Sequence, residues 1–594
     1  MKANATIRAK SKFRKFVWLT GILIMAGLAS SAHGLVWIWD STNLQWTTYL
    51  VDGKPIDTTI NRNANDPQTA IDAIGNTYVV FRQVDGAGNS RIYLSRYDAS
   101  GVVTIWDNDS FTWTANLLQG DPIDAATGGA AQDPQLAIDS NDWVYVVFSQ
   151  IDGTGDDRIY ISRYNGTDVK IYAGAGTWSS VFGLGSPIDA NTGNPARAPQ
   201  LAINSGNQVY VAFYQNDGAE NHIYLSRYDG FDVRIWQNNF LWTTTFNSGN
   251  PIDTGIAGRE ADSPKIAIDA LGRIYVAYRQ DDGTSFNVFL SRYTISNALE
   301  IWNSGAGLWT ATQSNGGPVG LPGATGDVLG PELTVDANDQ VYIAYAQQRT
   351  VVNRVFLSRY DGSEIQIWGD PWTDNLADGV PIDAGNFEAT VPQVIVDSSN
   401  NTYVAYGQIV AGIFRIHLSR WNGTDIEIWD TAGWTTTLAD GDPIDAATGQ
   451  AAFSPQMAVD TMDRVYVTYH QGDGADTRIY LSRYDDDANP NVVEIWNQTD
   501  QTWTTTFSDA APIDAATGGA ALSPQLAANT IDEVFITFFQ NDGIADHIFL
   551  SAYEPLGNPP SAPGISPGPP GGGGGGSGIS CFINTSDFGR LFAP

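Results

Sequence analysis

A motif of the type Pro-Gln-Leu-Ala-Ile-Asp recurs eight times, each time followed by a turn and a run such as Val-Tyr-Val-Ala-Phe. Its proline lies at Pro67, Pro134, Pro199, Pro264, Pro331, Pro392, Pro455 and Pro524, so successive copies are 61 to 69 residues apart. A period of this size is typical of one supersecondary unit copied around a ring or along a stack. The repeat therefore constrains the architecture of the 594 residues more than their composition does.

The second copy shows what one unit contains. Short apolar or alternating runs cover residues 135–139, 143–150, 158–164 and 169–172. Such alternation is typical of β-strands, and the intervening Asp152-Gly153 is typical of a hairpin turn. Each unit is therefore predicted to be a four-stranded antiparallel blade. The predicted fold class is all-β, with a single eight-bladed β-propeller over residues 35–555; an open stack of the same units is the alternative.

The two ends of the repeat region complement each other. Residues 35–40 match the fourth strand of other units, such as residues 426–430, whereas the last unit has only three strands between Pro524 and Tyr553. The N-terminal strand is therefore predicted to complete the last blade. This pairing would close the ring and cover two sheet edges.

Residues 1–34 are predicted to be a signal peptide. They contain six Lys or Arg and no acid, and an apolar run at residues 16–28 is followed by small residues. We expect an extracellular or cell-surface protein, with the periplasm as an alternative, that does not span a membrane after cleavage. Its net charge of −34 disfavours nucleic acid and favours cations or basic partners. The lone cysteine, Cys581, excludes an intramolecular disulfide framework.

Beyond the last unit, residues 556–578 are rich in proline and glycine and are predicted to form a disordered linker. Residues 579–594 form a short C-terminal tail. The glycine run that leads to Cys581-Phe582-Ile583 resembles the C-terminal tails of secreted bacterial proteins. That resemblance implies a candidate surface tether through Cys581, with a free thiol as the alternative.

Two series recur in all eight units and are candidate ligand-binding residues. A glutamine ends the second strand, and a ring of amides there could bind a polar ligand or satisfy backbone groups. It occurs as Gln83, Gln150, Gln215, Gln280, Gln347, Gln408, Gln471 and Gln540. A tryptophan follows the fourth strand and could stack on sugar rings or wedge adjacent blades together. It occurs as Trp46, Trp113, Trp178, Trp242, Trp309, Trp372, Trp434 and Trp503.

Charged residues also recur. Carboxylates in the hairpin after the second strand could hold Ca²⁺, or could simply suit tight Asp-Gly turns. These candidate metal ligands are Asp85, Asp152, Asp217, Asp282, Asp473 and Asp542. A second aspartate series lies in a Pro-Ile-Asp motif, at Asp57, Asp124, Asp189, Asp253, Asp383, Asp445 and Asp514. We expect it to form ion pairs between blades with the third-strand arginines Arg96, Arg163, Arg227, Arg292, Arg359, Arg420 and Arg483.

The sequence assigns no catalytic residues. No histidine pair has metal-ligand spacing, and no nucleophile elbow, Walker loop or Rossmann glycine pattern is present. His222 and His547 occupy a place where other units have arginine, which suggests a tolerant surface position. The fifth unit departs most from the repeat, at residues 316–330 and 348–349.

The combination Pro-Gln-Leu-Ala-Ile-Asp, Val-Tyr-Val-Ala-Phe and Ile-Tyr-Leu-Ser-Arg resembles the repeats of sialidase-like, BNR-type propellers. That family's Asp-box has the form Ser-x-Asp-x-Gly-x-Thr-Trp. Here Ser358, Asp361, Gly362 and Trp368 have similar letters at other offsets. The resemblance therefore implies the fold and not the activity.

These observations favour a secreted or cell-surface, non-catalytic binding or scaffold propeller that recognises a glycan or a protein. No cofactor is required, and Ca²⁺ is the candidate ion. An extracellular polysaccharide-active enzyme, a sialidase-like glycoside hydrolase or lyase, is the alternative. An enzyme should show one asymmetric pocket, whereas a multivalent binder should show equivalent sites between blades.

Overall fold

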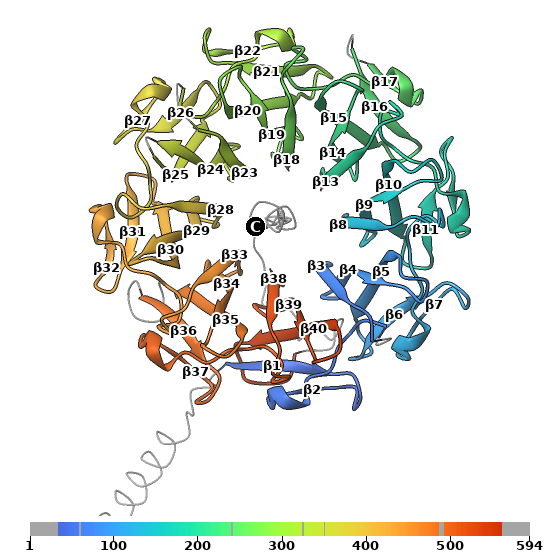
Figure 1. Cartoon of the computed structure of the whole chain (residues 1–594), viewed down its shortest axis with the longest axis vertical. Helices are drawn as coiled ribbons and strands as arrows, with labels where there is room; N and C mark the ends of the chain where they lie inside the picture. Colours follow the sequence, from blue (N-terminus) through green and yellow to red (C-terminus); the bar gives the residue numbers. More distant parts are fainter. Residues whose placement is uncertain are drawn as a thin grey trace, which may run out of the picture.

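The computed structural model describes residues 34–58, 61–238, 241–322, 326–349, 351–485 and 492–560. The predicted signal peptide, the linker beyond Pro560, the tail and Cys581 lie outside these ranges. Eight antiparallel sheets of five strands each stand around a ring (Figure 1). The predicted eight-bladed propeller is thus confirmed, with one more strand per blade than predicted.

The innermost strands carry the recurring proline motif and surround the centre of the ring (Figure 1). They are β3 (Ala64–Ile71), β8 (Ala131–Ile138), β13 (Ala196–Ile203), β18 (Ala261–Ile268), β23 (Val328–Val335), β28 (Ala389–Val396), β33 (Ala452–Val459) and β38 (Ala521–Ala528). In the first blade the register of β3 shifts between Asn65 and Gln68. Pro67 therefore lies at a β-bulge, where the missing N–H of proline leaves no gap in the ladder.

The second and third strands of each blade form its longest hairpin. The second strands are β4 (Thr77–Val84), β9 (Val144–Ile151), β14 (Val209–Asn216), β19 (Ile274–Asp281), β24 (Val341–Arg349), β29 (Thr402–Val410), β34 (Val465–Gly472) and β39 (Val534–Asn541). The third strands are β5 (Ser90–Tyr97), β10 (Asp157–Tyr164), β15 (Asn221–Tyr228), β20 (Phe286–Tyr293), β25 (Val352–Tyr360), β30 (Ile413–Trp421), β35 (Thr477–Asp485) and β40 (Asp546–Glu554).

The fourth strands are β6 (Val103–Asp107), β11 (Val169–Tyr172), β16 (Val233–Gln237), β21 (Leu299–Asn303), β26 (Ile365–Trp368), β31 (Ile426–Asp430), β36 (Val492–Asn497) and β1 (Leu35–Asp40). The short fifth strands are β7 (Thr112–Thr114), β12 (Trp178–Ser179), β17 (Leu241–Thr243), β22 (Leu308–Thr310), β27 (Trp372–Thr373), β32 (Gly433–Thr435), β37 (Thr502–Thr504) and β2 (Gln45–Thr47). Each fifth strand carries the tryptophan that follows the fourth strand in all eight units. Two or three residues are too few to show the alternation by which strands are recognised.

A short 3-10 helix follows each fifth strand and leads toward the next blade. These helices are η1 (Leu50–Asp52), η2 (Leu117–Gln119), η3 (Phe182–Leu184), η4 (Phe246–Ser248), η5 (Gln313–Asn315), η6 (Leu376–Asp378), η7 (Leu438–Asp440) and η8 (Phe507–Asp509). Within the described ranges no helix is long and apolar enough to cross a membrane.

The ring is closed as predicted by the N-terminal strand. β1 pairs with β40, with Leu35 opposite Glu554 and Ile38 opposite Ser551. The eighth sheet therefore has the order β2-β1-β40-β39-β38. Its buried core joins residues from both ends of the chain, such as Val36 and Ile38 with Phe549 and Tyr553.

Candidate functional site

The eight glutamines of the predicted amide ring are fully buried. Each bonds the loop that enters its own blade: Gln150 Nε2, for example, donates to the carbonyl oxygens of Ala125 and Gly129 at 2.6 and 3.2 Å. Gln215 accepts from the Ala190 N–H at 2.8 Å and donates to the Asn194 carbonyl. These contacts correspond to the structural alternative, in which the amides satisfy backbone groups.

The aspartates of the Pro-Ile-Asp motif form ion pairs at the seams between blades, but with another set of cations than predicted. At five seams an arginine at the start of the third strand places Nε 2.7 to 2.8 Å from the carboxylate; the pairs are Arg91–Asp124, Arg158–Asp189, Arg354–Asp383, Arg415–Asp445 and Arg478–Asp514. At two others a histidine takes this place, as His222–Asp253 and His547–Asp57. The position that we expected to be a tolerant surface position is therefore occupied by a cation that faces a buried carboxylate.

Burial dominates the electrostatics of these seams. It raises the pKa of Asp124, Asp383 and Asp445 to about 6, although the neighbouring arginines oppose the shift. The seam between the fourth and fifth blades has neither charge. Asn287 replaces the cation and Gly320 replaces the carboxylate, and a Cβ on Gly320 would clash with Asn287 Oδ1. The two members of the pair are thus present together or absent together, as desolvation of a lone buried charge demands.

The tryptophans of the fifth strands pack between blades. Each ring centroid lies 5.2 to 5.5 Å from an aromatic ring of the next blade, such as 5.3 Å for Trp113 and Tyr164. In seven blades an arginine of the third strand also lies over the indole, at 4.1 to 4.5 Å. This is where the structure places the arginines that we expected to pair with the Pro-Ile-Asp carboxylates. The contacts correspond to the wedge alternative for the tryptophans.

The hairpin aspartates predicted to bind Ca²⁺ cap their own turns. Asp542 Oδ1 accepts from the Ile544 and Ala545 N–H groups at 2.8 and 3.1 Å, and the other five make equivalent bonds. Several also approach the seam cation, as Asp473 does with Arg478 at 3.6 Å. Nowhere in the described part of the chain do three or more His, Cys, Asp or Glu gather as a metal site. Calcium binding stays a prediction.

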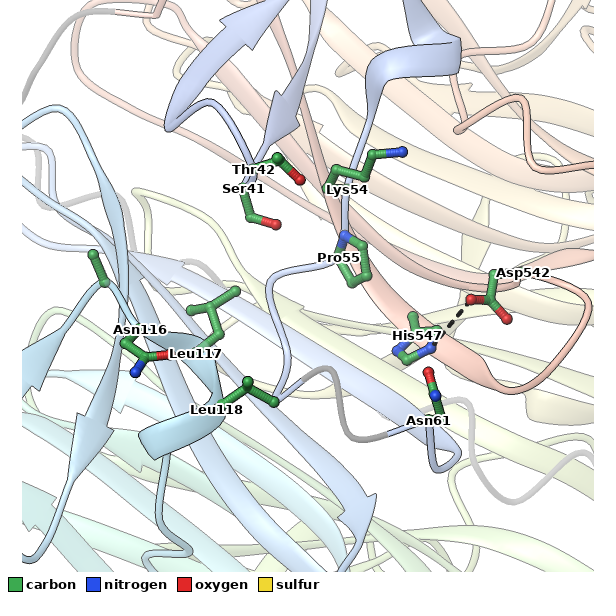
Figure 2. A pocket seen from close by; sticks show the side chains of 11 residues that line it. Ser41, Thr42, Lys54, Pro55, Asn61, Asn116, Leu117, Leu118, Asp542 and His547 are labelled. Atoms are coloured by element: carbon green, nitrogen blue, oxygen red, sulfur yellow. Dashed lines mark ion pairs between the residues drawn. The ribbon is translucent and has the colours of Figure 1, made fainter.

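A pocket of about 410 Å³ lies at the seam between the eighth and first blades (Figure 2). Its lining comes from four places: the turn after β1, the segment that enters the first blade, η2 with the residues before it, and the hairpin of the eighth blade. The lining residues are Ser41, Thr42, Lys54, Pro55, Asn61, Ala115, Asn116, Leu117, Leu118, Asp542 and His547. Polar groups of several kinds thus face an apolar wall of leucine and proline.

Lys54 is the feature that sets this seam apart. Its N–H bonds the Trp39 carbonyl, and the residues in the same place at the other seams are Asp121, Ser186, Asn250, Gly317, Val380, Asp442 and Ala511. In the first and sixth blades the carboxylate there accepts a bond from the turn after the fourth strand, as Asp121 does from Asn108 N–H at 3.0 Å. The lysine side chain has no acceptor, so it cannot accept such a hydrogen bond from the equivalent turn at Ser41 and Thr42. This turn borders the pocket.

His547 lines the pocket and lies between two carboxylates. Its Nδ1 is 3.0 Å from Asp57, which is buried, and its Nε2 is 3.6 Å from Asp542 (Figure 2). Burial disfavours the imidazolium, but the hydrogen bond to Asp57 and the charges of Asp57, Asp542 and Asp546 outweigh it and raise the pKa of His547. Both ring nitrogens are therefore held by the protein.

A second departure from eightfold symmetry surrounds the centre of the ring. Cross-strand pairs between the first and second strands are polar in blades one to four: Asn65–Arg82, Gln132–Ser149, Arg197–Tyr214 and Asp262–Arg279. In blades five to eight the equivalent pairs are Leu329–Ala346, Thr390–Gly407, Phe453–His470 and Leu522–Phe539. This inner rim is thus polar on one half and largely apolar on the other, and Phe453 is 42% exposed.

Sequence reasoning missed the pocket because its parts are far apart in the chain. Lys54 and His547 are nearly 500 residues apart, and neither belongs to a motif. The available signal was the lysine itself, since the residue before Pro-Ile-Asp or its equivalent is uncharged or acidic in all seven other units.

No family model and no curated protein matches this chain. Solved structures that resemble it include an ulvan lyase of polysaccharide lyase family PL25, with 11% identity, 71% of this chain and 93% of that chain covered, and a TM-score of 0.38. Others are an endo-arabinase from Bacteroides thetaiotaomicron (11%, 48% and 92%, 0.26) and a Hadza microbial sialidase (12%, 60% and 65%, 0.30). At these identities the likeness is one of fold alone.

Proposed function

We propose that this chain is a secreted or cell-surface binding propeller that recognises a glycan in the pocket between its eighth and first blades. The observation that carries the proposal is the pocket itself. At about 410 Å³ it falls within the range of small-ligand sites, roughly 300 to 1,000 Å³. It also lies at the seam where Lys54 stands in a place that is uncharged or acidic at the seven other seams.

The lining suits a saccharide. Lys54, Asn61, Asn116 and Asp542 offer donors and acceptors for hydroxyl groups, and Leu117, Leu118 and Pro55 offer an apolar wall for a ring face. The net charge of −34 repels polyanions at long range, so a neutral glycan is the preferred class. No carboxylate of the described residues forms an ion pair with Lys54, and its ammonium group could therefore bond a ligand.

The geometry favours binding over hydrolysis. Glycoside hydrolysis by the common route needs two carboxyl groups on either side of the scissile bond. The lining of this pocket includes one carboxylate, Asp542, which caps its hairpin. The second acid of the seam, Asp57, is buried and engaged with His547.

A glycan array probed with the full-length secreted protein tests the proposal. Lys54→Asp introduces the residue found at the first and sixth blades, so the variant should fold, and it removes the ammonium group. Losing one charged hydrogen bond of about 1.5–3 kcal/mol should weaken binding by roughly tenfold or more. The matched control is Asp121→Lys, which places a lysine at a regular seam and should leave binding unchanged.

The same array run with Ca²⁺ and with EDTA tests the calcium prediction, because loss of binding in EDTA would require an ion. Absence of binding in both conditions would overturn the glycan proposal for the glycans tested and favour a protein ligand. Shortened products from a bound glycan would instead support the enzymatic alternative.

A further inference from the structure

Seven blades share one arrangement at the end of the third strand, which we call the arginine slot. In it a guanidinium lies over the tryptophan of the fifth strand and, in six blades, donates to a tyrosine hydroxyl of the next blade. Arg96, for example, is 4.3 Å from the centre of Trp113 and donates to Tyr164 Oη at 3.1 Å. The slot also includes the residue opposite the arginine on the fourth strand, such as Glu427 opposite Arg420.

The eighth blade alters both members of this cross-strand pair. Ala552 replaces the arginine, and Trp37 lies opposite it. At the seven other positions the opposite residue is polar: Thr104, Lys170, Arg234, Glu300, Gln366, Glu427 and Glu494. A charged slot has thus become an aromatic one, bordered by Trp37, Trp46 and Tyr97.

The C-terminal segment returns to this slot and bonds the tyrosine that an arginine would meet there. Beyond β40 the chain turns back, with Gly557 N–H bonding the Glu554 carbonyl and Asn558 N–H bonding its carboxylate at 2.8 Å. Pro560 is buried, and its carbonyl accepts a hydrogen bond from Tyr97 Oη at 3.0 Å. In the next blade the equivalent hydroxyl, that of Tyr164, accepts from Arg96 and donates to the Gly166 carbonyl at 2.9 Å, so the Pro560 carbonyl serves Tyr97 as the acceptor while no arginine is present to donate.

We propose that this aromatic slot of the eighth blade is a binding site for a proline-containing segment, and that Pro559-Pro560 of the same chain is its ligand. Aromatic side chains that pack against proline while a side-chain donor bonds its carbonyl are a recurring mode of peptide recognition. Proline suits such a site because little conformational freedom is lost when it binds. Ala552 is required, because an arginine would fill the space.

The site determines where the chain leaves the propeller. Tyr97 and Glu554 lie at the ends of third strands, whereas His547 and the pocket lie at the opposite end of β40. Residue 34 also adjoins this end, because Leu35 pairs with Glu554. A tether that follows Pro560 would therefore leave the pocket face turned away from its anchor.

Hydrogen exchange on the full chain tests the proposal, read at the amides of residues 556–558. Ala552→Arg with Trp37→Glu restores the pair found in the sixth and seventh blades and should displace the segment. Exchange at these amides should then become about tenfold faster or more, as expected for local opening of a held segment. Unchanged exchange in a folded double variant would overturn the proposal.

A second variant avoids any change to the blade. Pro559→Ser with Pro560→Ser alters only the ligand and should speed exchange at the same amides. The matched control is Pro569→Ser with Pro570→Ser, another Pro-Pro pair in the linker. Equal exchange in these two variants would also overturn the proposal.

Discussion

The seam between the eighth and first blades keeps the buried carboxylate, the glutamine and the tryptophan of most other seams, but departs from all of them at Lys54, Ala552 and Trp37. Five of the seven other seams bury an Arg–Asp pair, one buries a His–Asp pair, and one has a neutral Asn–Gly pair. At all seven a second arginine stacks on a tryptophan. The closing seam has His547, Lys54, Ala552 and Trp37 in the corresponding places. The comparison teaches that the repeat changes most where the chain enters and leaves the ring, which is also where we propose that a glycan binds.

The largest expected effect breaks a regular seam. Asp445→Ala leaves Arg415 without its buried partner. We expect the free energy of unfolding to fall by about 3–5 kcal/mol, the usual result of removing one partner of a buried pair. Chemical denaturation measures the change. The double variant Arg415→Asn with Asp445→Gly copies the neutral seam between blades four and five, and it should cost less than the single variant. Additive costs would contradict the view that the pair is kept as a unit.

The next effect concerns the stacked arginines. Arg420 lies 4.2 Å from the centre of Trp434 and bonds Glu427 and Tyr484. Arg420→Ala should lower the melting temperature through a loss of about 1–2 kcal/mol. Arg420→Lys, which keeps the charge but not the planar group, should recover only part of it. An unchanged melting temperature for Arg420→Ala would show that a blade does not need this arginine. The absence of the arginine at Ala552 would then not have to be compensated by the segment at Pro560.

A pH profile sharpens the comparison at the histidine seams. The pKa of His547 is raised in the folded state. Its contribution to stability is therefore complete below the unfolded pKa of about 6.5 and is lost as the pH rises through the higher folded value. His547→Arg stays charged, so its advantage in melting temperature over the wild type should grow with pH in that window. A constant difference would show that His547 does not titrate there.

The smallest effect tests whether the inner rim takes part in binding. Phe453 is half exposed on the apolar side, and Phe453→Ala should reduce stability by less than about 1 kcal/mol. Glycan affinity should stay unchanged, because the pocket is at the outer seam. A loss of affinity comparable to that of Lys54→Asp would move the site to the centre of the ring.

Much of the fold could be predicted because its determinants are local. The period, the Asp-Gly hairpins and the match of residues 35–40 to a fourth strand give the blades, their order and the closure. The prediction that Arg96 and its equivalents pair with the Pro-Ile-Asp carboxylates was wrong for a geometric reason. Arg91 and Arg96 lie five positions apart on one strand, so their side chains face opposite sides and opposite ends. Only the path of the Pro-Ile-Asp loop across the hairpin end decides which of them meets Asp124.

The pocket and the proline site could not be predicted in the same way. Each joins residues from the two ends of the chain, and each depends on an exception to the repeat, at Lys54 or Ala552. An exception in a repeat says that a constraint has changed, but not which distant group now fills the place. The contact of Tyr97 with Pro560 spans 463 residues, whereas the equivalent hydroxyls of Tyr164 and Tyr228 bond carbonyl groups in the turn that follows them.

The pairing of β1 with β40 also has a mechanical consequence. Leu35 and Glu554 are opposite each other at one end of the pair, so tension applied to the two ends would open the ladder one rung at a time, as in unzipping. Strands loaded in this way resist force less than strands pulled in shear, whose hydrogen bonds must break together. Under such tension the segment held at Pro560 would be released first, and the strand that closes the ring would separate next.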